Sequence, residues 1–195
     1  RTDLMGTPLS PHFLDPPMVP PRHALRRVLF AGRLAPEKNL SAITEAVEAL
    51  PDLEFVMAGD GPLRRKMEAV AARCPNLRLT GWLGREALRK EMDDADLLLL
   101  PSHLETFGTV ALEALSRGRP ALVAEAAGIH QWTLLKGALY VLHNGESVAS
   151  RLQELRLLPR EELTEKAIAA RTAAETLNEQ TIDEWVGFVC QFARP

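Results

Sequence analysis

The chain has 195 residues, the length of one domain rather than two. Its hydrophobic share of 46% and charged share of 25% are average for a protein that folds in water, which excludes a disordered, collagen-like or disulfide-rich chain. Lys and Arg number 23 against 26 Asp and Glu, a net charge of −3, so nothing attracts the whole chain to nucleic acid or an anionic membrane. Any anion site has to be local.

Cysteine content and hydropathy indicate the cellular compartment in which the protein is expected. Cys74 and Cys190 are the only cysteines, and neither has a Cys or His partner at metal-ligand spacing, which predicts reduced thiols in a cytoplasmic protein. No apolar run approaches the roughly 20 residues of a membrane-spanning helix. Because the chain begins at Arg1, without a Met or a signal peptide, we expect it to be a piece of a longer protein.

Prolines crowd the first segment of the chain. Proline fixes φ and lacks the N–H group, so this segment is expected to form neither a regular helix nor a central strand. We therefore expect residues 1–24 to be a Pro-rich linker from a missing N-terminal domain and residues 25–195 to form the folded domain. The prolines concerned are Pro8, Pro11, Pro16, Pro17, Pro20 and Pro21.

Short apolar runs then alternate with helical patterns. The segments between the runs repeat apolar residues every three to four positions, as in Ile43, Val47 and Leu50. This alternation predicts an α/β fold, a Rossmann-like doubly wound sheet of about six parallel strands with helices on both faces. Helical patterns at residues 161–176 and 181–192 have no strand behind them and predict extra C-terminal helices. The predicted strands are residues 28–31, 53–58, 77–80, 97–100, 121–124 and 139–142.

Glycine recurs directly after these strands. Gly32 follows the first, Gly59 and Gly61 the second, Gly81 the third, and Gly108 lies in the turn after the fourth. In an open parallel sheet, ligands bind beyond the carboxyl ends of the strands. Glycine lets a backbone approach a ligand closely, although strand-to-helix turns also use it for geometry alone. The set as a whole favours a binding site at this edge.

Two features at the same edge favour a phosphate-bearing ligand. Arg33 and Lys38 supply two cations, although a solvated surface pair explains them equally well. Gly108 and Thr109 precede the apolar helical pattern 110–115, and the free N–H groups of a helix start bind anions.

Two glutamates complete the candidate site. Glu105 and Glu113 are eight residues apart, so their separation along a helix axis is at most about 12 Å, roughly the span of a diphosphate with a sugar on each side. This layout predicts that Glu113 accepts hydrogen bonds from a ribose and Glu105 from a second sugar. The alternative is a pair of ordinary charges on a helix and at its start.

Three motifs follow one another at the ends of successive predicted strands. Together with Trp82, which follows Gly81, they resemble the C-terminal, donor-binding domain of group 1 retaining glycosyltransferases with the GT-B fold, over about residues 28–148. The motifs are Gly32-Arg33-Leu34 to Glu37-Lys38-Asn39, then Gly59-Asp60-Gly61-Pro62, then Pro101-Ser102-His103-Leu104-Glu105-Thr106-Phe107-Gly108 with Glu113.

The resemblance implies a role for each motif. Arg33 and Lys38 would bind the donor diphosphate and Glu113 the ribose. Glu105 would be the catalytic residue, the first Glu of the family's Glu-x7-Glu motif, near the transferred sugar and its anomeric carbon. The backbone around Gly81 and Trp82 would hold the nucleobase. The other donor-binding residues implied are Gly59, Gly61, Phe107, Gly108 and Thr109.

The implied activity is transfer of a sugar from a nucleotide-diphosphate sugar to an acceptor, with retention and without a metal or other cofactor. This chain would be the donor-binding half, inactive alone, and its partner the missing N-terminal acceptor-binding domain. No nucleic acid is expected, and peripheral membrane contact of the full protein is left open. The alternative function is a non-catalytic module that binds a nucleotide or nucleotide-sugar.

The chain departs from the family pattern in residues 127–138. Ala127-Gly128-Ile129-His130-Gln131 stands where the family often has Gly-Gly-x-x-Glu, and the usual Gly-rich segment is shortened. Whether this loop keeps its donor contacts is open.

Three other interpretations rank lower. Asp94-Ala95-Asp96 imitates a metal motif but precedes a strand, at the edge opposite the candidate site. Ser102, His103 and Glu105 have the residue types of a hydrolase triad, but neighbours in sequence rarely point at one another. A dinucleotide dehydrogenase is disfavoured because no Gly-x-Gly-x-x-Gly follows the first strand.

Overall fold

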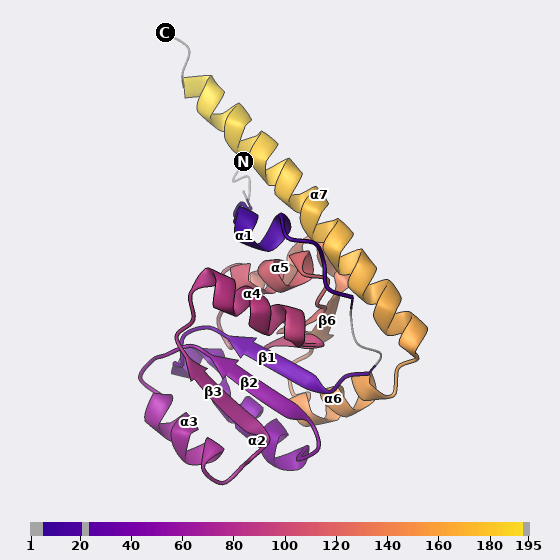
Figure 1. Cartoon of the computed structure of the whole chain (residues 1–195). Coiled ribbons are helices and arrows are strands. Elements are labelled where there is room, and N and C mark those ends of the chain that lie inside the picture. Colours follow the sequence, from indigo (N-terminus) through magenta and orange to yellow (C-terminus); the bar gives the residue numbers. More distant parts are fainter. Residues whose placement is uncertain (1–5, 21–23, 193–195) are drawn as a thin grey trace.

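A single parallel sheet organises the chain. The computed structural model describes residues 6–20 and 24–192. The six strands of the sheet lie in the order β3-β2-β1-β4-β5-β6, so the order along the chain changes direction between β1 and β4. Figure 1 shows β3, β2 and β1 side by side. This confirms the predicted fold class, and each predicted apolar run falls on one strand. The strands are β1 (Arg27–Ala31), β2 (Glu54–Ala58), β3 (Leu77–Gly81), β4 (Leu97–Leu100), β5 (Ala121–Ala124) and β6 (Leu139–Leu142).

Helices cover both faces of the sheet. Val28 and Phe30 of β1 point to the face covered by α2 (Leu40–Ala49), α3 (Arg64–Ala71) and α6 (Val148–Arg156). Leu29 and Ala31 point to the other face, covered by α4 (Arg85–Asp94) and α5 (Thr109–Ser116). A strand that is covered on both sides has no solvent face, which explains why the strand sequences are continuously apolar.

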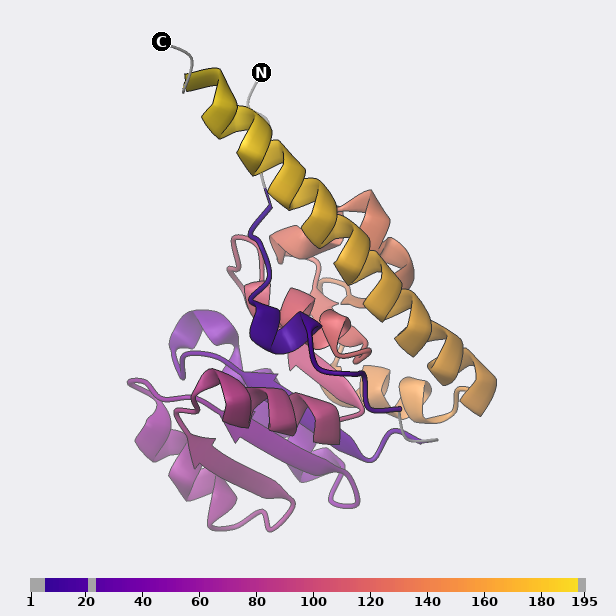
Figure 2. The ribbon, with the colours of Figure 1, turned by 45° about the horizontal axis from the view of Figure 1, so that its top comes forward.

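The C-terminal part of the chain is one helix, α7 (Arg160–Phe192). The prediction of two separate helical segments was wrong, because the residues between them contain neither Gly nor Pro to end a helix. The first half of α7 buries Ala170, Ala174 and Leu177 in the core that α5 shares. The second half projects past the sheet, as Figure 2 shows, and leaves Trp185 and Val186 exposed.

The described part of the Pro-rich segment, residues 6–20, packs against α4, α5 and α7. It contains the one-turn helix α1 (Pro11–Leu14), which the proline content had not led us to expect; Pro11 occupies its first turn, where the missing N–H has no helical partner to lose. Because proline has no N–H group, carbonyl groups in this segment lack nearby backbone donors. Arginine side chains donate to these carbonyl groups instead. The buried Arg117 donates to the carbonyls of Phe13, Pro16 and Pro17, and Arg171 donates to that of Leu14. That this segment serves as a linker between domains stays a prediction.

No helix among the described residues is both long and apolar enough to cross a lipid bilayer.

Candidate functional site at the switch point of the sheet

The loops that follow the first three strands pack backbone against backbone. The N–H of Gly32 donates to the carbonyl of Ala58 at 2.9 Å, and the N–H of Gly59 donates to that of Gly81 at 2.8 Å. A Cβ at Gly59 would lie 1.9 Å from the carbonyl oxygen of Gly32, and one at Gly61 would lie 2.6 Å from that of Leu34. Only glycine fits at these two positions, so both have a structural role that is independent of any ligand.

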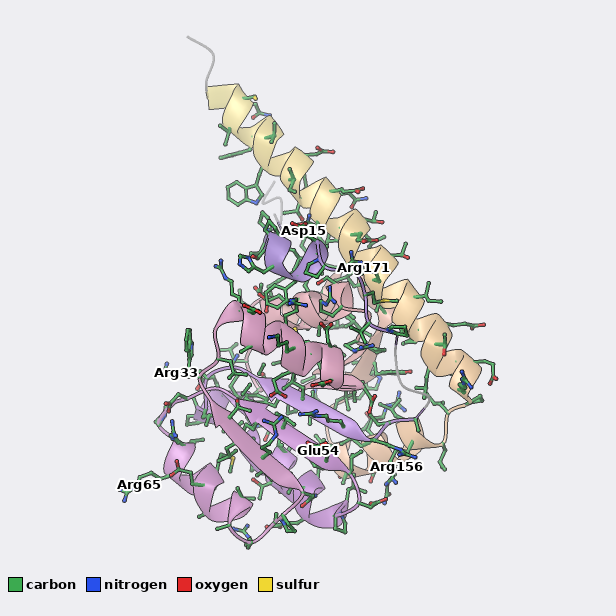
Figure 3. All side chains as sticks on the ribbon, in the orientation of Figure 1. Asp15, Arg33, Glu54, Arg65, Arg156 and Arg171 are labelled. Atoms are coloured by element: carbon green, nitrogen blue, oxygen red, sulfur yellow. The ribbon has the colours of Figure 1, made fainter. Side chains whose placement is uncertain are left out.

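A pocket of about 410 Å³ opens at this edge. It brings together four residues that the sequence analysis singled out, Arg33, Gly59, Trp82 and Glu113. Arg33 is exposed and projects from the end of the sheet toward which β1, β2 and β3 run (Figure 3). The other lining residues are mostly small or apolar: Ala31, Gly32, Ala58, Asp60, Leu83, Leu88 and Val110.

Glu113 is the most perturbed acid of the pocket. It lies one turn into α5, facing the apolar Leu83, Leu88 and Val110. Burial raises the pKa of its carboxyl group to about 7, and the charge of Arg85 opposes the rise. Its carboxylate has no hydrogen bond or ion pair within residues 6–20 and 24–192. A carboxylate without protein partners in an apolar wall is suited to accept hydrogen bonds from ligand hydroxyl groups.

Lys38 and Glu105 bind each other instead of lining this pocket. The Nζ atom of Lys38 forms an ion pair with Oε2 of Glu105, and each side chain is mostly buried, with 16% and 17% of its surface exposed. Lys38 ends the 3-10 turn Pro36–Lys38 that follows β1, and Glu105 lies in the loop that follows β4. The pair therefore bridges β1 and β4, where the strand order reverses and where ligands of such sheets bind.

The start of α5 borders the same crevice. Gly108 is the N-cap residue and has a positive φ of 91°, and no side chain caps the N–H groups of the first turn, where Thr109 lies. Phe107, the residue before Gly108, packs edge-on against Trp132, with ring centroids 5.7 Å apart. Phe107 thus has a packing partner that the sequence did not predict.

Gly81 and the altered loop border the site without lining the main pocket. Gly81 lies in a neighbouring hollow with Gly59 and Arg64. In the altered loop, the N–H of Gly128 donates to the carbonyl of Glu105 at 3.0 Å. The changed sequence therefore still holds the loop that carries Glu105, and Nδ1 of His130 is occupied by a hydrogen bond to the Ala127 carbonyl.

Sequence reasoning did not assign a role to several pocket residues. Asp60 stands inside the quoted Gly-Asp-Gly motif and could have been proposed. Leu83 and Leu88 carry no motif, since they come from the loop and helix after β3 and reach the pocket only through the packing of α4. Arg85, whose charge acts on Glu113, had no signal of its own.

The lower-ranked motifs do not form the sites that they imitate. Ser102 is fully buried, His103 is exposed and Glu105 pairs with Lys38, so the hydrolase arrangement is not formed. Oδ2 of Asp96 accepts the N–H groups of Arg26 and Arg27 at the opposite edge. Across the described part of the chain, no three His, Cys, Asp or Glu residues gather as a metal site.

Known proteins resemble this chain in sequence and in fold. The sequence profile of the family "Glycosyl transferases group 1" matches residues 20–170. Sulfoquinovosyl transferase SQD2 of Arabidopsis thaliana is 30% identical over 151 residues, which are 76% of this chain and 29% of that protein. A 2-deoxystreptamine N-acetyl-D-glucosaminyltransferase of Niallia circulans is 37% identical over 110 residues, 53% of this chain and 28% of that protein.

Two solved structures illustrate the shared fold. Sucrose-phosphate synthase from Thermosynechococcus elongatus superposes with a TM-score of 0.75 at 19% identity, covering 95% of this chain and 49% of that one. HepE of Anabaena, solved in complex with UDP and glucose, gives 0.67 at 20% identity, covering 84% and 49%. The chain thus spans under a third of the two curated relatives and about half of the two solved chains.

Proposed function

Because the chain belongs to the group 1 glycosyltransferase family, we propose that it binds the nucleoside diphosphate part of a nucleotide-sugar and presents the sugar for transfer. The protein that contains it would transfer this sugar to an acceptor with retention at the anomeric carbon. The acceptor-binding half would be a separate domain, since transfer needs donor and acceptor in near-attack geometry.

One observation carries the proposal: one edge of the sheet, beyond the carboxyl ends of its strands, carries groups suited to each part of such a donor. Arg33 in the pocket and Lys38 at the end of the turn that follows β1 offer positive charge for the diphosphate. Glu113 offers an acceptor for ribose hydroxyls inside the apolar pocket, and the exposed indole of Trp82 offers a stacking surface for a base. Glu105 would meet the transferred sugar, where a carboxylate stabilises developing positive charge.

The complex of HepE with UDP and glucose supports this assignment by analogy of fold. We also propose that the reaction needs no metal ion, with the two cations serving the diphosphate instead. Addition of EDTA should then leave nucleotide binding and transfer unchanged.

A non-catalytic nucleotide-binding module is the second candidate. The altered loop 127–138 favours it, because a loop that lost its donor contacts would leave nucleotide binding intact while transfer fails. The full-length protein distinguishes the two: turnover of a nucleotide-sugar in the presence of acceptors supports the transferase, and tight binding without turnover supports the module.

The first experiment is a donor screen on this chain, with thermal shift and then calorimetry on UDP, GDP, ADP and their sugar conjugates. Arg33→Ala should weaken binding of the selected diphosphate by roughly 10- to 100-fold, because a charge-assisted hydrogen bond contributes about 1.5–3 kcal/mol. Arg65→Ala is the matched control, because Arg65 points into solvent from α3 (Figure 3). Absence of binding by any diphosphate, or equal losses in the two variants, would refute the assignment.

A further inference from the structure

The ion pair between Lys38 and Glu105 is held from both sides. The N–H of His103 donates to the carbonyl of Glu37 at 2.9 Å, which joins the loop after β4 to the turn after β1. Behind Glu105, a β-bridge connects its backbone to Ala127. Both side chains are more than four-fifths buried. The pair is therefore a positioned contact rather than a chance meeting of surface charges.

The pairing changes what each residue offers to a ligand. Lys38, the cation assigned to the diphosphate, is already neutralised by Glu105, the carboxylate assigned to the sugar. A phosphate that approaches Lys38 also approaches the negative charge of Glu105. The cation therefore attracts the phosphate less than its charge alone would suggest.

A bare nucleoside diphosphate and its sugar conjugate differ in the charge and in the hydroxyl groups that they would present to Glu105. At pH 8 the terminal phosphate of a nucleoside diphosphate carries about one more negative charge than the same phosphate esterified to a sugar. The sugar also brings hydroxyl groups that donate to a carboxylate. Glu105 thus repels the first ligand and accepts hydrogen bonds from the second.

We propose that the Lys38–Glu105 pair selects the sugar conjugate over the bare nucleoside diphosphate, and so favours departure of the diphosphate once the sugar has been transferred. This inference rests on the proposed donor-binding function. It makes Glu105 a specificity-determining residue even where no sugar is present to touch it.

A ligand that removes the extra charge without adding sugar hydroxyl groups tests the proposal on the unmodified protein. The probes are UDP, its β-methyl ester and UDP-glucose, or the GDP series with GDP-mannose where the donor screen selects guanine. The methyl ester lacks the extra charge but has no sugar hydroxyls. By calorimetry at pH 8 it should bind more tightly than the bare diphosphate. Equal or weaker binding of the ester would overturn the proposal.

Substitution of the carboxylate gives the second test. Glu105→Gln should tighten binding of the bare diphosphate on the order of tenfold, as expected for loss of one nearby like charge in a partly buried site. The sugar conjugate should gain less, so the ratio of the two dissociation constants falls. If Glu105 were only a sugar contact, affinity for the bare diphosphate would not change.

Glu37→Gln is the matched control, because it removes the same charge from the residue next to Lys38. The Glu37 carboxylate has no ion pair or hydrogen bond in the described part of the chain, so the ratio should stay within about twofold. Lys38→Met should reduce the gain produced by Glu105→Gln, which separates action through Lys38 from a general charge effect. Failure of every diphosphate to bind overturns the donor-binding function as well; binding without these differences overturns the selection alone.

Discussion

Replacing Glu113 by Gln should stabilise the protein above neutral pH and have little effect near pH 4.5. The folded structure holds the pKa of this carboxyl at about 7, above the ordinary value of 4.5, because the pocket wall buries it. Between these two pH values the folded chain binds more protons than the unfolded chain. Its stability therefore falls as the pH rises through this window.

The magnitude follows from the difference between the two pKa values. Each difference of 1 corresponds to about 1.4 kcal/mol, so ionising Glu113 costs the folded state at most about 3 kcal/mol at pH 8. Gln has nearly the same size and no charge at any pH. The variant should escape this loss, so it gains stability over the native protein as the pH rises.

Urea denaturation at pH 5, 6, 7 and 8 measures the effect. The free-energy difference between Glu113→Gln and the native protein should grow with pH and level off near pH 8. Glu45→Gln on the exposed side of α2 controls for general charge effects and should change stability by less than about 0.5 kcal/mol throughout. A difference for Glu113→Gln that is the same at pH 5 and pH 8 would refute the assignment of the buried charge.

Two further predictions concern the frame of the site. Gly59→Ala should lower the free energy of unfolding, measured by urea titration, by about 2 kcal/mol or more, because its Cβ would overlap the carbonyl oxygen of Gly32. Gly137 has open space around it, so Gly137→Ala is the control and should leave this free energy nearly unchanged. Arg117→Ala should cost about 3–5 kcal/mol, because a buried carboxylate partner and three carbonyls lose their donor, and limited proteolysis should then cut the N-terminal segment faster. A variant as stable as Arg65→Ala would show that the segment is held by other contacts.

The strands and the edge at which the site lies were readable from the sequence. A continuously apolar run such as residues 97–100 is typical of a strand that helices cover on both faces. Glycines beside such runs identify the loops that approach one another closely. Both signals are local along the chain. The fold class and the six strand positions therefore agree with prediction, and Arg33, Gly59, Trp82 and Glu113 do meet in one pocket.

Local patterns failed where the outcome depended on partners far away in the chain. The Pro-rich segment looked unstructured, yet Arg117, about 100 positions later, supplies the donors that its carbonyls lack. The two helical patterns near the C-terminus looked separate, yet nothing between them ends a helix, and α7 continues past the core that holds its first half.

The electrostatics of the site were decided by tertiary structure alone. Lys38 and Glu105 are 67 positions apart, and only the adjacency of β1 and β4 brings them together. Burial raises the pKa of Glu113, and the pocket in which it lies is lined in part by Leu83 and Leu88, which come from the loop and helix after β3. A sequence specifies which residues carry charge, but the energy of a charge depends on the distance to its partners and on the water it loses, and both are set by the folded packing.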